Sequence, residues 1–165
     1  MVEIRKAVKN DAEQIISVMK NAEASGFMLF DLGERKVVVE SFATFIKTVN
    51  QNEKSGIFIA DEKDRIVGYL IVQGEKHKWT SHRAYIAVGI HSDSRRKGVG
   101  RALFLHVIDW AEKVGLHRLD LTVLTDDNAT VDLYKKMGFI IEGINRDSLM
   151  INGAYVDEYY MAKLI

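Results

Sequence analysis

The chain has 165 residues, of which 47% are hydrophobic, and its 23 Lys and Arg residues balance its 23 Asp and Glu residues. A chain of this length can bury about 70% of the surface that its unfolded state exposes, so we expect one domain over residues 1–165. The absence of cysteine excludes disulfides, thiol nucleophiles and cysteine-ligated metals. A formal charge of zero does not favour nucleic-acid or membrane partners, and no apolar run approaches the roughly 18 residues of a membrane span. We therefore expect a cytoplasmic protein.

Strands are expected where apolar, β-branched residues cluster or alternate between turn residues. The expected strands are 4–7, 56–60, 66–72, 83–90, 119–124, 139–142 and 155–162. Helices are expected where apolar residues recur at helical spacing after a capping residue. They are a helix that begins after Asn10 or Asp11, 37–50, 98–114, and a helix that begins at 125–128 and ends at Gly138. The segment 25–34 reads as irregular.

The order of these elements predicts the fold class. A strand, a helix and a strand over residues 83–124 imply a parallel pair with a right-handed crossover, whereas the other strands are joined by hairpins. The expected fold is therefore α/β, with a mixed, mostly antiparallel sheet, a central parallel strand pair and flanking helices.

Residues 90–103 leave an expected strand, turn through two glycines and begin an expected helix. Glycines allow several backbone N–H groups to point into one concavity, and the N-terminus of the helix adds partial positive charge there. Four cationic side chains surround this turn: Arg95, Arg96, Lys97 and Arg101. The pattern favours a phosphate-bearing ligand over its alternative, a solvated and charged helix entry.

Other phosphate-binding patterns do not fit this turn. A dinucleotide fingerprint needs a small residue three positions after Gly100, where Leu103 stands. A P-loop needs Gly-Lys-Ser/Thr, whereas Gly100 is followed by Arg101. A surface for single-stranded nucleic acid would interleave exposed aromatic residues with the basic ones, and this turn has none.

The turn resembles the phosphate loop of the Gcn5-related N-acetyltransferase (GNAT) family, Arg/Gln-x-x-Gly-x-Gly/Ala, which stands here as residues 95–100. A second segment, 128–139, is similar to the family's Asn-x-x-Ala-x-x-Leu-Tyr-x-Lys-x-Gly-Phe, with Val131 in place of the usual alanine. With residues 4–7, the resemblance extends over essentially the whole chain. The tail 153–161 resembles the small-amine and amino-acid (phosphinothricin-type) branch. One departure is Ser92, where many members carry proline; we expect it to loosen the turn slightly.

The resemblance implies that acetyl-CoA is the co-substrate. In the family, the loop amides hold its pyrophosphate, and the preceding strand is bulged and pairs with the pantetheine through its backbone. On this chain the implied cofactor-binding residues are Val88, Gly89, Ile90, Arg95, Arg96, Lys97, Gly98, Val99, Gly100, Arg101, Asn128 and Tyr134. No metal is expected, because the five histidines are dispersed without ligand spacing.

Tyr134 is the catalytic residue that the resemblance implies, as the acid that protonates the departing thiolate. A phenol of pKa about 10 can serve a thiolate of pKa about 8.5 only with help from geometry or from the amine's proton. The alternative is that Tyr134 only packs between Val131 and Met137. Asn128 binds the cofactor or caps the helix, and both roles are compatible. The oxyanion donor is expected to be a backbone amide within 88–90.

A general base is not evident, because residues 83–90 hold no carboxylate where some family members place a glutamate. The candidates are Glu75, His82, His91 or a chain of waters in which Tyr85 takes part.

The acceptor pocket is expected between the first two helices, where the family builds it. The predicted substrate-binding residues are Glu23, Phe27, Phe30 and His82. A carboxylate there suits an amine and aromatic rings suit a cation, although Phe27 and Phe30 also fit a plain core.

The sequence therefore predicts an acetyl-CoA-dependent N-acetyltransferase that transfers acetyl directly to a free amino acid or similar small amine. Two alternatives stay open: an acetyltransferase of protein N-termini of the ribosomal-protein type, and a non-catalytic acyl-CoA-binding module. A homodimer through the C-terminal strands is compatible with the tyrosine-rich residues 155–161.

Overall fold

The computed structural model describes residues 2–24 and 39–165. Within them, seven strands form one sheet in the order β1-β2-β3-β4-β5-β7-β6. The strands are β1 (Glu3–Lys6), β2 (Gly56–Glu62), β3 (Arg65–Gly74), β4 (Arg83–Ile90), β5 (Arg118–Leu124), β6 (Ile140–Ile151) and β7 (Ala154–Leu164). The helices are α1 (Ala12–Ala24), α2 (Val39–Gln51), α3 (Val99–Lys113) and α4 (Asn128–Lys136), with short 3-10 turns η1 (Lys9–Asp11), η2 (Lys78–Thr80) and η3 (Ser92–Ser94).

The predicted fold class is confirmed. β4 and β5 pair in parallel, joined by α3, and the other pairs of strands in the described residues are antiparallel. Predicted and observed ends differ by three residues or fewer except in β6, which was expected to end at 142 and runs to Ile151. Its centre, Asn145 to Ser148, has the polar composition of a turn, and the sheet accommodates it by a shift of register with Asp147 at φ 49°.

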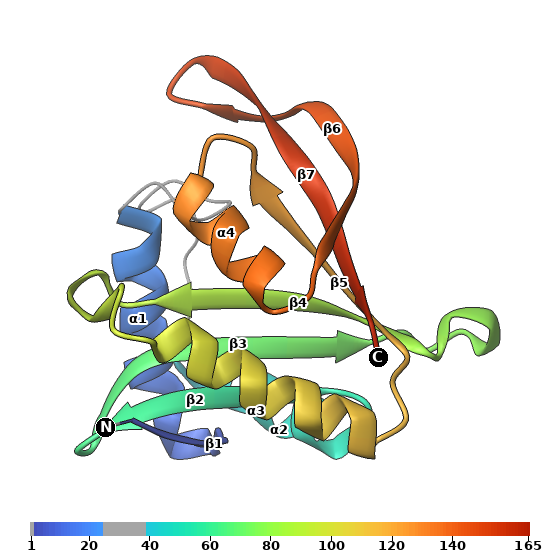
Figure 1. The fold of residues 1–165 in the computed structure, drawn as a ribbon. Helices are drawn as coiled ribbons and strands as arrows, with labels where there is room; N and C mark the ends of the chain where they lie inside the picture. Colours follow the sequence, from blue (N-terminus) through green and yellow to red (C-terminus); the bar gives the residue numbers. More distant parts are fainter. Residues whose placement is uncertain (1, 25–38) are drawn as a thin grey trace.

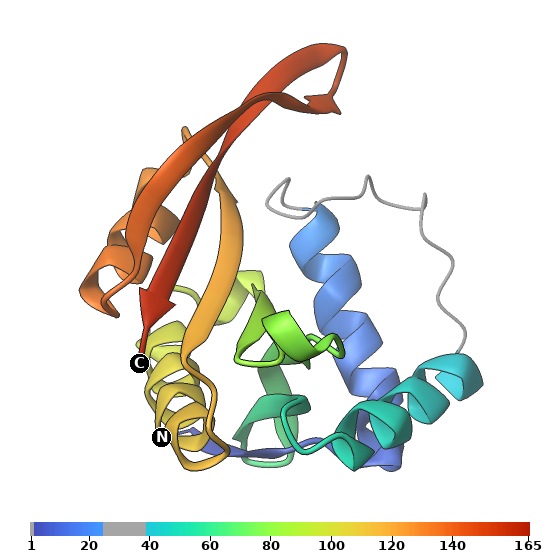
Figure 2. The same cartoon turned by 90° about the vertical axis from the view of Figure 1, so that its right-hand side faces the viewer.

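Helices cover the sheet on both faces, α1 and α2 on one and α3 and α4 on the other (Figure 2). Alternate residues of β2 supply both sides, since Ile57 and Ile59 pack in the cluster with α1 and α2, whereas Phe58 packs in the cluster with α3. Burial on both faces explains why β2 and β3 read as nearly continuous apolar runs. None of the described helices has the length and apolar character needed to cross a membrane.

β4 and β5 are neighbours in the sheet but pair over a short stretch. The pairing joins Arg83–Tyr85 to Arg118–Asp120 and then ends, and the two strands diverge toward their C-terminal ends (Figure 1). We call the unpaired stretch, 86–90 of β4 beside 121–124 of β5, the split. Its closed end is at residue 85, and its mouth is at residue 90.

The bulge expected at 88–90 of β4 is absent, so this expectation is wrong. β4 pairs with β3 in an unbroken register from Ala84 opposite Gly74 to Ile90 opposite Gly68. A glycine at 89 is nevertheless required, because a Cβ there would lie 2.7 Å from the Tyr69 hydroxyl. The ring of Tyr69 thus packs directly on the backbone of β4.

Candidate active site

The direction of the backbone groups of β4 defines one wall of the split. The N–H of His91 donates to Val67 of β3, and the carbonyl of Arg83 accepts from Glu75, so the odd-numbered residues face β3. Because successive residues of a strand point their backbone groups to opposite edges, Val88 and Ile90 face the split. Such groups need a partner when water is excluded, which makes this edge suited to a ligand with amide groups.

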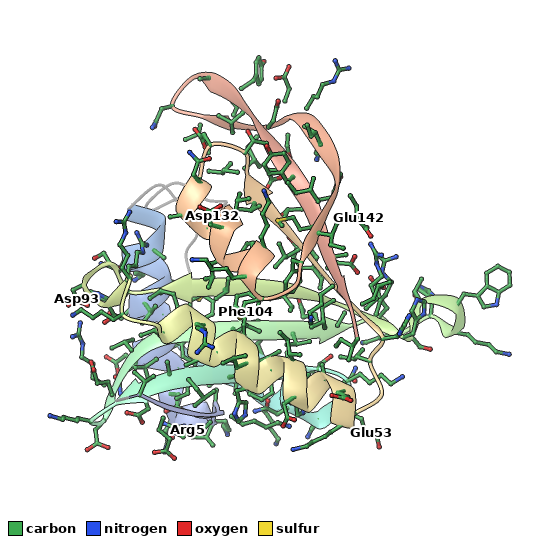
Figure 3. The ribbon with its side chains drawn as sticks, viewed as in Figure 1. Arg5, Glu53, Asp93, Phe104, Asp132 and Glu142 are labelled. Atoms are coloured by element: carbon green, nitrogen blue, oxygen red, sulfur yellow. The ribbon has the colours of Figure 1, made fainter. Side chains whose placement is uncertain are left out.

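Ion pairs fasten the closed end of the split. Arg83 Nε lies 2.9 Å from one carboxylate oxygen of Asp120, and Arg118 Nε lies 2.8 Å from the other. Arg118 also binds the Glu142 carboxylate of β6 through both terminal nitrogens, which lowers the pKa of Glu142. Glu142 is labelled beside β6 in Figure 3. The charges cancel within the network and tie β4, β5 and β6 together.

The basic turn lies at the mouth of the split, between β4 and α3. Arg96 and Gly98 both adopt positive φ, 59° and 82°, and Gly98 is the N-cap of α3 without a side-chain cap. The first-turn amides of this 15-residue helix therefore lack a side-chain acceptor at the cap, and the helix dipole adds positive charge. The turn therefore leaves backbone N–H groups available at a helix N-terminus, and the predicted binding of an anion there stays a prediction.

The four cations of the turn differ in their surroundings. Arg95 is half-buried and its Nε donates to the carbonyl of Ile90 at 3.3 Å. Burial lowers the pKa of the Arg95 guanidinium, and the charge of Asp127 acts in the opposite direction. Arg96, Lys97 and Arg101 are exposed. Arg95 thus holds the end of β4, whereas the other three cations face solvent around the helix entry.

Ser92, the departure from the family pattern, is fastened to α1. Its N–H donates to Asn21 Oδ1 at 2.7 Å, and Asn21 Nδ2 donates to the Ser92 hydroxyl at 3.1 Å. Asp93, labelled in this turn in Figure 3, pairs with Arg65 of β3 at 3.0 Å. The side chain of Asn21 therefore supplies a restraint on the turn that a proline ring would supply by covalent geometry.

Tyr134 lies in α4 with its ring in the core. The ring centroid is 5.4 Å from Phe104 and 6.0 Å from Phe139, and Phe104 of α3 points toward α4 (Figure 3). Its hydroxyl makes no hydrogen bond within the described residues, although every fully buried side-chain N or O atom there has a partner. The oxygen must therefore border open space. Burial raises the pKa of the phenol far above its ordinary value, and the Asp127 charge and the Tyr85 and Tyr69 phenols raise it further.

The two sequence motifs meet in space. A Cβ on Gly100 would lie 3.0 Å from Leu133 Cδ2, so glycine allows the first turn of α3 to approach α4 closely. Asp127 caps α4 by accepting from the N–H of Thr130 at 3.3 Å. The capping role considered for Asn128 therefore belongs to Asp127, another of the residues 125–128 at which the helix was expected to begin; Asn128 is the first residue of α4 and is exposed.

The face of the sheet opposite α3 and α4 carries a pocket of about 360 Å³ beside the closed end. Its lining includes Arg83, Tyr85, Asp120, Thr122, Glu142 and Tyr160. The Tyr85 hydroxyl is 2.8 Å from Thr122 Oγ1, which links β4 to β5 two residues beyond the last backbone pair of β5. The two terminal nitrogens of Arg83 make no hydrogen bond within the described residues. Sequence reasoning missed Arg83 and Thr122, because their proximity depends on the register of a parallel pair.

Of the predicted acceptor residues, Glu23 and His82 are not among the residues that line this pocket. Phe27 and Phe30 lie outside the described residues, and Glu23 is in the last turn of α1. His82 precedes β4, is exposed, and has its ring 6.4 Å from that of His117.

Two further candidates for the base lie at opposite ends of β4. Glu75 binds the carbonyl of Arg83 through its backbone at the closed end. At the mouth, His91 pairs with Asp93 at 2.7 Å. Of the residues considered for proton transfer, Tyr85 is the one that lines the pocket. The described residues hold no group of three or more potential metal ligands.

Comparison with known proteins agrees with this geometry. The family model "Acetyltransferase (GNAT) domain" matches residues 4–160. The L-amino acid N-acetyltransferase AaaT of Escherichia coli is 34% identical over 100 residues, 60% of this chain and 62% of that protein, so the match spans less than two thirds of the relative. The [ribosomal protein bS18]-alanine N-acetyltransferase of E. coli is 29% identical over 113 residues, 68% of this chain and 74% of that protein.

Solved structures share the fold over nearly the full length. A GNAT-family acetyltransferase from Streptococcus pneumoniae has a TM-score of 0.95 and 27% identity, with both chains covered fully. A phosphinothricin acetyltransferase from Sinorhizobium meliloti, solved in complex with acetyl-CoA, has a TM-score of 0.87 and 17% identity over 99% of this chain and 88% of that one. With the family model covering most of its length, this chain belongs to the GNAT acetyltransferase family.

Proposed function

We propose that residues 1–165 act as one acetyl-CoA-dependent N-acetyltransferase unit that transfers acetyl directly to the amine of a free amino acid or a similar small amine. The observation that carries the proposal is the split between β4 and β5, with a phosphate-binding turn at its mouth and Tyr134 beside it. The family match and the acetyl-CoA bound to the S. meliloti neighbour support the choice of co-substrate.

The residues of the mouth suit the anionic part of acetyl-CoA. The amides at the start of α3 and the side chains of Arg96, Lys97 and Arg101 offer donors and positive charge for its phosphates. The backbone groups of Val88 and Ile90 offer hydrogen bonds to the amides of its pantetheine arm. When bound, acetyl-CoA supplies an activated acetyl group as a thioester.

Two groups of the chain assist the transfer in this proposal. The N–H of Val88 faces the split and can stabilise negative charge on the acetyl oxygen. Tyr134 stays protonated, because burial raises its pKa, and its hydroxyl can donate a proton to the departing sulfur. The same burial disfavours a free thiolate, so the pKa of the acid and the pKa of the leaving thiol are both raised. Asn128 is kept as a cofactor-binding candidate at the start of α4.

The pocket on the open face is the acceptor site in this proposal. The free terminal nitrogens of Arg83 form a fork that suits a carboxylate. The Tyr85 and Thr122 hydroxyls can accept a hydrogen bond from the amine and relay its proton to water, each taking one proton as it gives up its own. An α-amino acid carries both groups on one small molecule. The similarity to the L-amino acid N-acetyltransferase AaaT supports this acceptor class.

The test measures CoA release from acetyl-CoA with a panel of amino acids, diamines and short peptides. A thiol reagent is well suited, because the chain has no cysteine and gives no background. Transfer to free amino acids is the expected result. A protein that binds no acetyl-CoA by calorimetry and releases no CoA with any amine would refute the proposal.

The peptides separate the second candidate from the first. The match to the ribosomal protein bS18-alanine N-acetyltransferase favours a protein N-terminus as acceptor. Transfer to peptides that begin with alanine, without transfer to free alanine, would assign the chain to that function. Binding of acetyl-CoA without turnover of any acceptor would instead indicate an acyl-CoA-binding module.

We also propose a cytoplasmic homodimer through the C-terminal hairpin. β6 is an edge strand, and the hairpin exposes large apolar side chains: Ile140, Ile144, Met150, Tyr155 and Leu164. A second copy of the chain would cover them. Light scattering of the purified protein should give twice the chain mass of 18.7 kDa.

A further inference from the structure

The hydrogen bond between Tyr85 and Thr122 lies where an acyl group would end. The phosphate-binding turn follows the C-terminal end of β4, so a thioester that extends from this turn into the split directs its acyl group toward the closed end. There the backbone ladder resumes at Tyr85 opposite Asp120. The length available to the acyl group is therefore set at this end.

Three surfaces close that end. The backbone pair of Tyr85 and Asp120 closes it along the strands. Ile86 and Leu121 are buried in the cluster under α3 and close the core face. On the open face, the 2.8 Å bond from Tyr85 to Thr122 joins the two strands across the start of the split. Without this bond, the closed end would widen into the part of the 360 Å³ pocket that both side chains line, while the rest of the open face stays accessible to an acceptor.

We propose that the Tyr85–Thr122 hydrogen bond limits the acyl donor to acetyl by closing the inner end of the split. The inference rests on the proposed acyltransferase function and adds the selection of acyl length to it. Core packing on one face and paired backbone at the end cannot yield to extra methylenes without disrupting the sheet. The hydrogen bond joins two side chains, of which Tyr85 is 39% exposed, so this surface can be changed by a substitution without disrupting the sheet.

The experiment compares acetyl-CoA, propionyl-CoA and butyryl-CoA in two measurements. Calorimetry without acceptor gives the dissociation constants, and CoA release with the best acceptor gives kcat/KM. The variants are Tyr85→Ala, which removes the closing surface on the open face, and Thr122→Val, which keeps the volume but removes the hydrogen-bond partner. Tyr160→Ala is the matched control for the calorimetry without acceptor, since Tyr160 lies opposite Thr122 but makes no bond to Tyr85.

The wild type should bind butyryl-CoA at least about tenfold more weakly than acetyl-CoA, the lower limit for one misfitting methylene. In Tyr85→Ala and Thr122→Val this ratio should fall to about twofold or less, and in Tyr160→Ala it should stay at the wild-type value. Equal binding of both thioesters by the wild type would overturn the inference and leave the acetyltransferase proposal intact. The inference would also be overturned if Tyr85→Ala and Thr122→Val fold and keep the wild-type ratio of the butyryl-CoA and acetyl-CoA dissociation constants. Absence of binding to every thioester would overturn the proposed function and this inference with it.

Discussion

Replacing Tyr134 with phenylalanine removes one oxygen atom and keeps the ring that packs on Phe104 and Phe139. If the hydroxyl gives a proton to the leaving sulfur, kcat should fall by about 10²-fold or more, the usual contribution of a positioned general acid. This is about 3 kcal/mol of transition-state stabilisation. The dissociation constant of acetyl-CoA should change little.

The same substitution should leave the fold intact. The hydroxyl has no hydrogen-bond partner within the described residues, so its removal costs no bond there. We expect the free energy of unfolding to stay within about 1 kcal/mol of the wild type. Steady-state kinetics, calorimetry and thermal unfolding, with Tyr159→Phe in β7 as the control, separate these effects. Equal kcat in wild type and Tyr134→Phe would remove Tyr134 from the mechanism.

The raised pKa of Tyr134 predicts a dependence of stability on pH with a definite sign. In the unfolded chain this phenol ionises at about pH 10, whereas in the folded protein it stays neutral to higher pH. Stability from this group is therefore full below about pH 10 and is lost above it, at about 1.4 kcal/mol per pH unit. Denaturant unfolding at pH 9, 10 and 11 should show a steeper loss in the wild type than in Tyr134→Phe. An equal loss of stability with pH in the wild type and in Tyr134→Phe would contradict the inferred burial of the Tyr134 hydroxyl.

Four further substitutions test the rest of the site. Arg83→Gln should raise the KM for amino acids about tenfold and leave that for amino acid amides unchanged; an equal rise for both would argue against carboxylate binding. Gly98→Ala places a side chain at φ 82° and should cost about 1–2 kcal/mol of stability, whereas Gly100→Ala, in a helix but with its Cβ 3.0 Å from α4, should mainly weaken acetyl-CoA binding. Asn21→Ala removes two hydrogen bonds to the basic turn and should weaken acetyl-CoA binding about fivefold by calorimetry, whereas unchanged affinity would show that the turn keeps its conformation without Asn21.

The elements that sequence reasoning located well are those whose signals are local. The glycines at 98 and 138 adopt positive φ next to helix ends, where the sequence predicts one helix to begin and another to end. The strands at 119–124 and 66–72 were predicted from their apolar residues alone. Such a pattern, whether alternating or continuous, follows directly from the burial of the strand. β6 was predicted too short, because its central polar residues signal a turn, and a shift of register in the sheet overrides that signal.

The parts of the site that sequence reasoning missed depend on register and on contacts between distant segments. The network of Arg83, Arg118 and Glu142 joins three strands, and none of its members is exceptional in its own segment. The bridge from Tyr85 to Thr122 needs a parallel pair that stops after three residues, a length that no local pattern encodes. Asn21 binds a turn 71 residues away and could not be identified from spacing.

The short ladder between β4 and β5 also has a consequence for local opening of the protein. β2, β3 and β4 are antiparallel neighbours on one side of the ladder, and β5, β7 and β6 are antiparallel neighbours on the other. Amide hydrogens along the split, such as that of Val88, should therefore exchange with solvent sooner than those within either set of strands. A ligand that bonds to this edge would act as the missing strand between the two sets. Its binding should then be visible as slowed hydrogen exchange along β4 and as a rise in thermal stability that grows with ligand concentration.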